Sequence, residues 1–129
     1  MDLSIIREDL KEIRYYYAHR DIFEKASKHI GEHSCIEKIN KYNNIIRFAP
    51  ARLYELYVLM YLENNTLESL AIKEGYSYVH IQRLHGQLVK FIQEKLETKG
   101  EIAWRKLFQI SLLVLIMYIA LNIILLGKL

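Results

Sequence analysis

The sequence predicts an all-α protein, with a helical hairpin at residues 1–49, a second helical domain at residues 50–99 and an apolar helix at residues 104–127. Three observations lead to this fold class. Apolar residues recur at helical spacing along most of the chain. Five glycines and a single proline leave little turn chemistry for a sheet. A length of 129 residues suits one small domain with an appendage.

The N-terminal part carries two apolar stripes. Residues at alternating three- and four-residue steps define the first, namely Leu3, Ile6, Leu10, Ile13 and Tyr17. The phase of the pattern shifts around Ile22, and Gly31 begins a polar segment that is expected to end the helix. A second stripe consists of Ile36, Ile39, Asn43 and Ile46. Residues 2–30 and 35–47 are therefore expected to pack as an antiparallel helical hairpin.

A central helix is predicted from Pro50 to about Glu63. Proline suits the first helical position, so Ala49 is the expected cap, and Phe48 and Leu53 would form a hydrophobic staple. The apolar residues cover more than half of the helix circumference, which predicts burial between other helices; they are Leu53, Leu56, Tyr57, Met60 and Tyr61.

Residues 66–86 have the pattern of a helix-turn-helix. Either Thr66 or Asn65 can cap a helix over residues 67–74, and Ser77 can cap a second helix that continues to about Thr98. The motif needs a small residue at the helix crossing, a turn residue that tolerates positive φ, and buried aliphatics on both helices. These positions hold Ala71, Gly75, Leu70, Ile81 and Leu84. An ordinary helical hairpin is the alternative interpretation.

The second of these helices presents side chains that suit DNA. The candidate DNA-binding residues are Ser77, Tyr78, Val79, Gln82, Arg83 and Lys90. Gln82 can pair with adenine, Arg83 with guanine, and Val79 can meet a thymine methyl group. Lys90 is placed for a phosphate contact. A solvated polar face is the alternative for each of these residues.

Residues 52–92 resemble region four of bacterial sigma factors, in which a helix precedes the helix-turn-helix. The segments IREDLKEIRYYYA and IEKINKYNNIIRFAPARLYELYVLMYL, with the segment that follows, look like the phage-borne RinA/ArpU-type transcriptional regulators. This resemblance covers about residues 3–96. It implies a cytoplasmic, sequence-specific regulator of phage late or packaging genes, with DNA-facing residues Ser77, Tyr78, Val79, Gln82 and Arg83.

Charge is unevenly distributed along the chain. No acidic residue follows Glu101, and Arg105, Lys106 and Lys128 account for the formal net charge of +3, so residues 1–101 are formally neutral. A protein that coats nucleic acid indiscriminately is therefore not expected. Any phosphate-facing surface must be local, and the affinity for DNA should be modest.

Neither a catalytic nor a metal site is expected. Cys35 is the single cysteine, which excludes an intramolecular disulfide and fits a reducing compartment. His29 and His33 are one helical turn apart near Cys35, but Gly31 interrupts the helix and a fourth ligand is missing. No phosphate-binding glycine loop, Ser/His/Asp order or carboxylate pair is evident. The chain is therefore interpreted as a protein without enzymatic activity, cofactor or metal.

The segment Leu107–Leu126 is long and apolar enough to span a membrane. Its polar members are Gln109, Ser111 and Asn122, and twenty residues in a helix cover about 30 Å. Trp104 suits the membrane interface, and Arg105 with Lys106 favours a cytoplasmic location for the preceding domain. A tail anchor on the cytoplasmic face is expected, and a buried oligomerisation helix is the alternative.

The function expected from these features is that of a sequence-specific DNA-binding transcription regulator of phage or mobile-element origin, tethered to the membrane. Double-stranded DNA is the expected partner, with RNA polymerase and a second copy of the chain as further candidates. The rival hypothesis is a membrane-anchored interaction or signalling protein that uses the helical domain as a scaffold for protein contacts.

Overall fold

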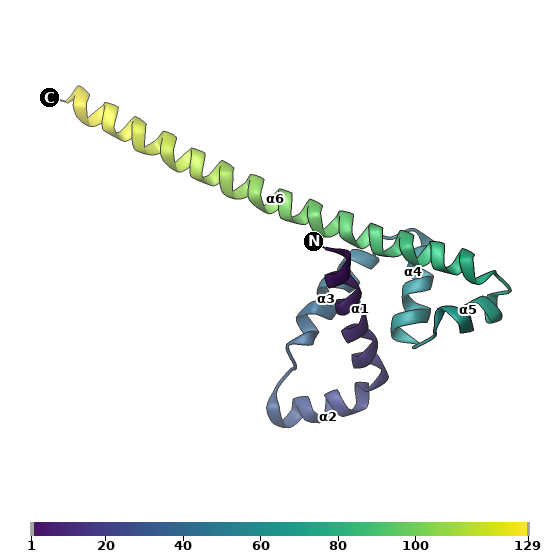
Figure 1. Ribbon diagram of the computed structural model, residues 1–129. Coiled ribbons are helices and arrows are strands. Elements are labelled where there is room, and N and C mark those ends of the chain that lie inside the picture. Colours follow the sequence, from purple (N-terminus) through teal and green to yellow (C-terminus); the bar gives the residue numbers. More distant parts are fainter. Residues whose placement is uncertain (1, 129) are drawn as a thin grey trace. The chain divides into compact units, whose positions relative to one another are not determined.

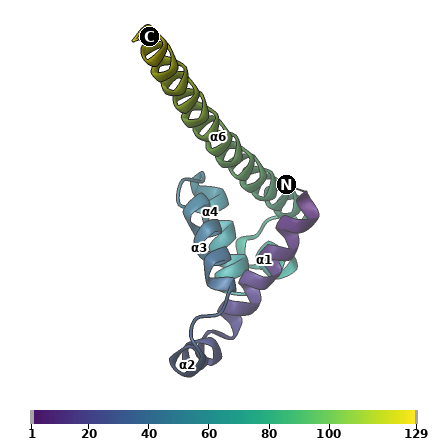
Figure 2. The same ribbon diagram turned by 90° about the vertical axis from the view of Figure 1, so that its left-hand side faces the viewer.

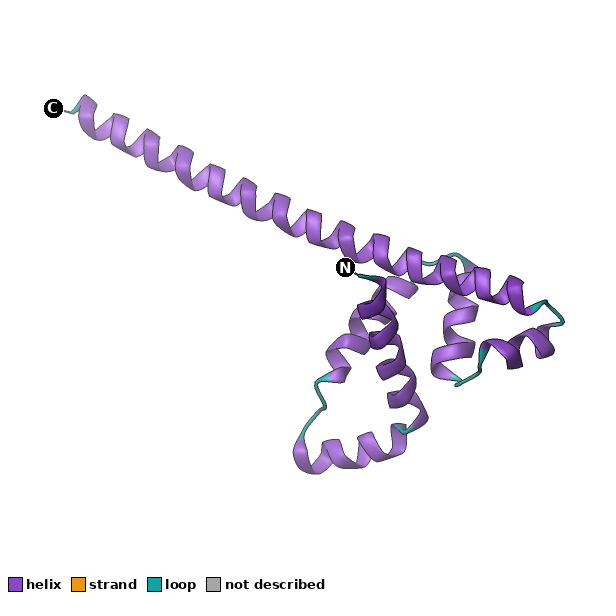
Figure 3. Cartoon of the chain, in the orientation of Figure 1, coloured by secondary structure: helices purple, strands orange, loops and turns teal. Residues whose placement is uncertain are grey.

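All elements of secondary structure in the described chain are helical. The computed structural model describes residues 2–128, with the side chains of all of them except residues 99–102. In chain order the helices are α1 (Leu3–Ala18), α2 (Arg20–Ile30), α3 (Cys35–Ile46), α4 (Ala51–Tyr57), the π-helical turn η1 (Val58–Leu62), α5 (Leu67–Glu74) and α6 (Tyr78–Gly127) (Figure 1). Figure 3 shows helices and short loops, and no strand, over residues 2–128. The all-α prediction is confirmed.

The chain divides into two compact units, Met1–Leu96 and Glu97–Leu129. The first contains α1 to α5, the beginning of α6 and a single cluster of buried apolar side chains that ends at Leu96. The predicted helix end near Thr98 is wrong, because α6 is one helix from Tyr78 to Gly127. Since no proline follows Pro50, nothing in this stretch removes a helical hydrogen bond.

The second unit consists of the C-terminal part of α6. Its side chains from Leu107 to Leu126 are exposed and mostly apolar. In the part of the chain that the structure describes, α6 is the one helix long and apolar enough to cross a membrane. The predicted membrane-type segment is therefore present as a helix.

The hairpin in the first unit is built by α1 and α3. Ile6, Leu10 and Ile13 are buried on α1 and belong to the same core as Ile39 and Tyr42 on α3. The prediction of one helix over residues 2–30 is wrong, because the chain leaves helical geometry at His19 (φ −121°, ψ 29°). The apolar pattern changes phase around Ile22, so a straight continuation of α1 would not keep both parts of the pattern on the core side. Helix α2, which contains no buried residue, instead connects α1 with α3 (Figures 1 and 2).

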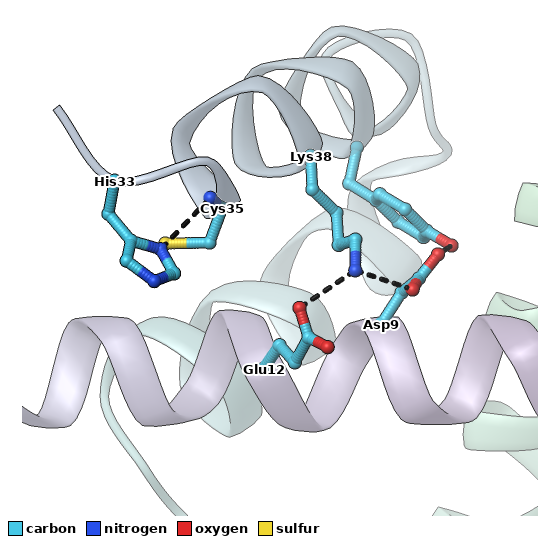
Figure 4. A network of polar contacts seen from close by, with 6 residues as sticks. Asp9, Glu12, His33, Cys35 and Lys38 are labelled. Atoms are coloured by element: carbon cyan, nitrogen blue, oxygen red, sulfur yellow. Dashed lines mark hydrogen bonds and ion pairs between the residues drawn. The ribbon is translucent and has the colours of Figure 1, made fainter.

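A polar network fastens α1 to α3 at the edge of this core. Lys38 of α3 lies 3.0 Å from a carboxylate oxygen of Asp9 and 2.7 Å from one of Glu12, both on α1 (Figure 4). The buried Tyr42 donates its hydroxyl hydrogen to the other Asp9 oxygen at 2.6 Å. The hydrogen bonds with Glu12 and Asp9 raise the pKa of Lys38, which favours its charged form.

Helix α4 and the turn η1 form the central layer of the core. All five residues predicted to be buried there are buried, namely Leu53, Leu56, Tyr57, Met60 and Tyr61. Pro50 is the N-cap and Ala51 the first helical residue, so the expected cap at Ala49 is displaced by one position. The predicted staple is wrong, because the Phe48 side chain is 77% exposed while Leu53 is buried.

Candidate nucleic-acid interface

Local capping features begin α5, end it at the turn and begin α6. At the start of α5, Thr66 accepts a hydrogen bond from the Ser69 amide, and the Ser69 hydroxyl accepts one from the Thr66 amide, which makes a capping box. Gly75 ends α5 in the left-handed conformation (φ 70°, ψ 20°). Ser77 then accepts a hydrogen bond from the His80 amide at 3.2 Å and caps α6.

The aliphatic side chains predicted to hold the helix-turn-helix together belong to the core or pack against it. Leu70, Ala71 and Ile81 are buried in the main core, and Leu84 packs against it. The Tyr76 amide donates to the Ala71 carbonyl at 3.1 Å, which closes the turn at the C-terminal end of α5. The small side chain of Ala71 lets α5 approach its neighbours, and the buried aliphatics fix how α5 and the start of α6 lie together (Figure 1).

All six candidate DNA-binding side chains are exposed, and together they form what we call the recognition surface: Ser77, Tyr78, Val79, Gln82, Arg83 and Lys90. Val79, Arg83 and Lys90 share one helical face because they are four and seven residues apart. Tyr78 and Gln82, also four apart, occupy the adjacent strip. Ile81, Leu88 and Ile92 are buried on the opposite side of α6. The core therefore fixes which side of α6 faces outward.

The charge near the recognition surface is compatible with a polyanion. The first turn of α6 contains no acidic residue. Arg83 and Lys90 supply positive charge along the exposed face, and Lys73 on α5 donates to the side chain of Asn65 at 2.9 Å. Two exposed side chains with apolar surface, Tyr78 (41% exposed) and Val79 (60% exposed), complete a surface that offers both hydrogen bonds and apolar contact.

Behind the recognition surface, a hydrogen bond between the buried Tyr61 and the half-buried His85 joins α6 to the core. The Tyr61 hydroxyl lies at 2.5 Å from Nε2 of His85. Burial raises the pKa of Tyr61 to about 12, so its hydroxyl stays protonated and donates a hydrogen bond to the imidazole. Burial, together with the charges of Arg7 and Arg14, lowers the pKa of His85 and favours the neutral ring that accepts this bond.

His33 and Cys35, near Gly31, take part in the start of α3. His33 Nδ1 accepts a hydrogen bond from the Cys35 amide at 3.1 Å, so this nitrogen serves to start α3 (Figure 4). Burial raises the pKa of the Cys35 thiol, which disfavours the thiolate that a metal would need. Among the described residues, no three His, Cys, Asp or Glu side chains are grouped to hold a metal ion.

One group of functional candidates was not predicted from the sequence. Arg7, Lys11 and Arg14 project from α1 into a cavity that His85 and the first turn of α5 also line. The spacing of these three basic residues is visible in the sequence, but the packing of α1 against η1, which brings them to the start of α5 and to His85, is not. Only the tertiary arrangement brings them to the helix-turn-helix.

Comparison of the chain with protein-family models, with curated proteins and with solved structures gives no match. The resemblance to RinA/ArpU-type regulators and to sigma region four therefore rests on the residues quoted for it.

Proposed function

We propose that the chain is a sequence-specific DNA-binding transcription regulator. The observation that carries the proposal is the turn at Gly75, from which α6 starts with its core side fixed and the recognition surface exposed. A recognition helix needs hydrogen-bonding side chains near its N-terminal end, and Ser77, Gln82 and Arg83 occupy that end. The family resemblance adds a phage or mobile-element context.

The DNA contacts divide into two kinds. Gln82 and Arg83 have the amide and guanidinium groups that pair with adenine and guanine edges in the major groove. Lys90 lies seven residues beyond Arg83, about 10 Å along the helix, and suits a phosphate. RNA polymerase and a second copy of the chain are further proposed partners, since regulators with this motif commonly act as dimers at paired half-sites.

We also propose that residues 107–126 anchor the protein in a membrane. The segment is helical, exposed and apolar over the length needed to cross the hydrocarbon layer. Trp104 suits the interface, and Arg105 with Lys106 favours a cytoplasmic location for the DNA-binding unit. The regulator would then act on DNA close to the membrane.

Binding titrations test the base contacts. Replacement of Arg83 or Gln82 by Ala should weaken binding to a preferred duplex by about 1–3 kcal/mol and binding to random DNA much less. The Lys90→Ala variant should weaken binding to both duplexes alike, because a phosphate contact carries no sequence information. If Arg83→Ala and Gln82→Ala bind both duplexes as the parent does, α6 does not contact base edges.

A second candidate function is a membrane-anchored scaffold for protein contacts. Helix α2 favours it, because α2 has no buried residue and exposes Ile22 (65%) and Ile30 (86%). A scaffold of this kind would enrich no duplex sequence, and its partner binding would be lost on replacement of Ile22 and Ile30 by Ser. A DNA regulator would retain its duplex preference after the same replacement.

A further inference from the structure

A cavity of about 340 Å³ opens beside the helix-turn-helix in the unit Met1–Leu96. Arg7, Lys11 and Arg14 line it from α1, and His85 lines it from α6. The three basic residues are four and three positions apart, so they share one face of α1. The cavity is within the volume range of sites for small organic ligands.

Neighbouring neutral groups hold the positive charge of Arg14 in place. Its Nε donates to the Met60 carbonyl at 3.1 Å, and Nη2 donates to the Asn65 carbonyl at 3.3 Å. The guanidinium carbon lies 5.0 Å from the centroid of the Tyr61 ring. Within residues 2–128, no ion pair neutralises Arg14 or Arg7. The cavity wall therefore contains a fixed cation without an acidic partner.

The other charges around the cavity leave it positive. Lys11 lies 3.2 Å from Glu8, but both side chains are at least 70% exposed, so water screens this pair strongly. Glu68 is the acidic residue that lines the cavity. Three cations thus face one carboxylate at the cavity wall. The charges of Arg7 and Arg14 contribute to the lowered pKa of His85, which is consistent with a positive electrostatic potential at the cavity.

The remaining surface of the cavity is apolar. Met60, which is buried, and Leu67, which is half-buried, contribute hydrocarbon to its lining. A bare inorganic anion would leave this part without a contact. A phosphate joined to a sugar would place its charge at Arg7 and Lys11 and its carbon skeleton against the apolar wall.

We propose that this cavity binds the phosphate and sugar of a nucleotide, with Arg7 and Lys11 as the contacting cations and Arg14 as a fixed charge behind them. The nucleotide belongs either to the DNA strand at the recognition surface or to a free nucleotide. The DNA source rests on the proposed function, whereas the free-nucleotide source does not.

The test compares two full-length variants in detergent micelles. Arg7→Gln with Lys11→Gln removes two charges at the cavity, and Lys25→Gln with Lys28→Gln removes two exposed charges on α2. With DNA as the source, the cavity variant should bind duplex more weakly and should lower the slope of log K against log salt concentration by about 1–2. The α2 variant should keep the slope of the parent, and circular dichroism should show that both variants fold.

A second arm measures binding of deoxyadenosine monophosphate and of inorganic phosphate by calorimetry, and it does not depend on any duplex preference. Binding of the nucleotide to the parent and the α2 variant, with at least tenfold loss in the cavity variant and weaker binding of inorganic phosphate, supports the free-nucleotide source. An altered salt slope supports the DNA source. If the cavity variant matches the parent in both arms, the proposal is wrong, whether or not the recognition surface binds DNA.

Discussion

Tyr61 and His85 join the core to α6 through one hydrogen bond between a buried and a half-buried ring. Arg14 reinforces this position, because its guanidinium lies over the Tyr61 ring and donates to the carbonyl groups of Met60 and Asn65. A neutral imidazole is needed to accept the Tyr61 hydroxyl hydrogen, and the nearby guanidinium groups oppose a second positive charge. The orientation of α6 should therefore depend on the protonation state of His85.

The pH dependence of stability tests this conclusion. Because the pKa of His85 is lowered in the folded state, the unfolded chain binds a proton more readily as the pH falls below about 6.5. The free energy of unfolding should therefore be unaffected by His85 at pH 7.5 and should fall as the pH decreases towards the folded pKa. Urea unfolding at pH 7.5 and 5.5, followed by circular dichroism, measures the loss.

The variant His85→Gln serves as the control for the other titrating groups. Glutamine retains a hydrogen-bonding group for Tyr61 and has no charge to gain. We expect a smaller loss of stability between pH 7.5 and 5.5 in this variant than in the parent. An equal loss in both proteins would show that His85 does not couple the core to pH.

Among the helices, burial of an apolar stripe was predictable and the ends of helices were less so. The stripe of Ile6, Leu10 and Ile13 correctly predicted the buried side of α1. The break at His19 depends on how α2 crosses from α1 to α3, which a single helical periodicity does not specify. The continuation of α6 past Thr98 follows from helix-forming residues without proline.

The candidate site was predictable where it depends on local sequence. Gly75 and Ser77 mark the turn by their own backbone and capping chemistry, and the core residue Ile81 determines which residues of α6 are exposed. The cavity around Arg7 and Lys11 was not predictable, because residues of α1, η1, α5 and α6 that are far apart in the chain line it. Long-range packing of this kind leaves no periodic signal in the sequence.

Substitution of Gly75 tests the assigned turn directly. A Cβ atom added there meets no atom within 4 Å, so the cost of Gly75→Ala is the left-handed conformation itself, about 1 kcal/mol. Gly86 lies inside α6, where a Cβ atom also meets nothing, so Gly86→Ala should stabilise by about 0.5–1 kcal/mol. Chemical unfolding of the two variants should show opposite signs, and destabilisation of similar size in both would contradict the assigned turn.

Under the proposed function, the unit Met1–Leu96 would bind DNA and the unit Glu97–Leu129 would attach the protein to a membrane. Every buried side chain of the described core lies at or before Leu96, so a fragment of residues 1–99 should fold and keep the duplex preference of the whole chain. The C-terminal segment has no share in that core. Its removal should change where the protein is found and leave its folding intact.

Membrane attachment is tested by a charge placed in the middle of the apolar segment. Ile116→Arg should cost about 2.5–3.5 kcal/mol of insertion free energy and shift the full-length protein from the washed membrane fraction towards the soluble fraction. Ile22→Arg introduces the same charge at an exposed position of α2 and should leave the distribution unchanged. Parent protein that stays soluble without detergent would contradict the anchor.

The central claim is that α6 reads base sequence from the exposed side of its first two turns. Selection of random duplexes on the parent and on the Arg83→Ala variant, in parallel and at low salt, tests it most directly. We expect the parent to enrich a defined motif, and the variant to enrich the same motif with the preference lost at one guanine, because one bidentate contact is removed. A parent that enriches no sequence, or a variant that enriches the unchanged motif, would contradict the account.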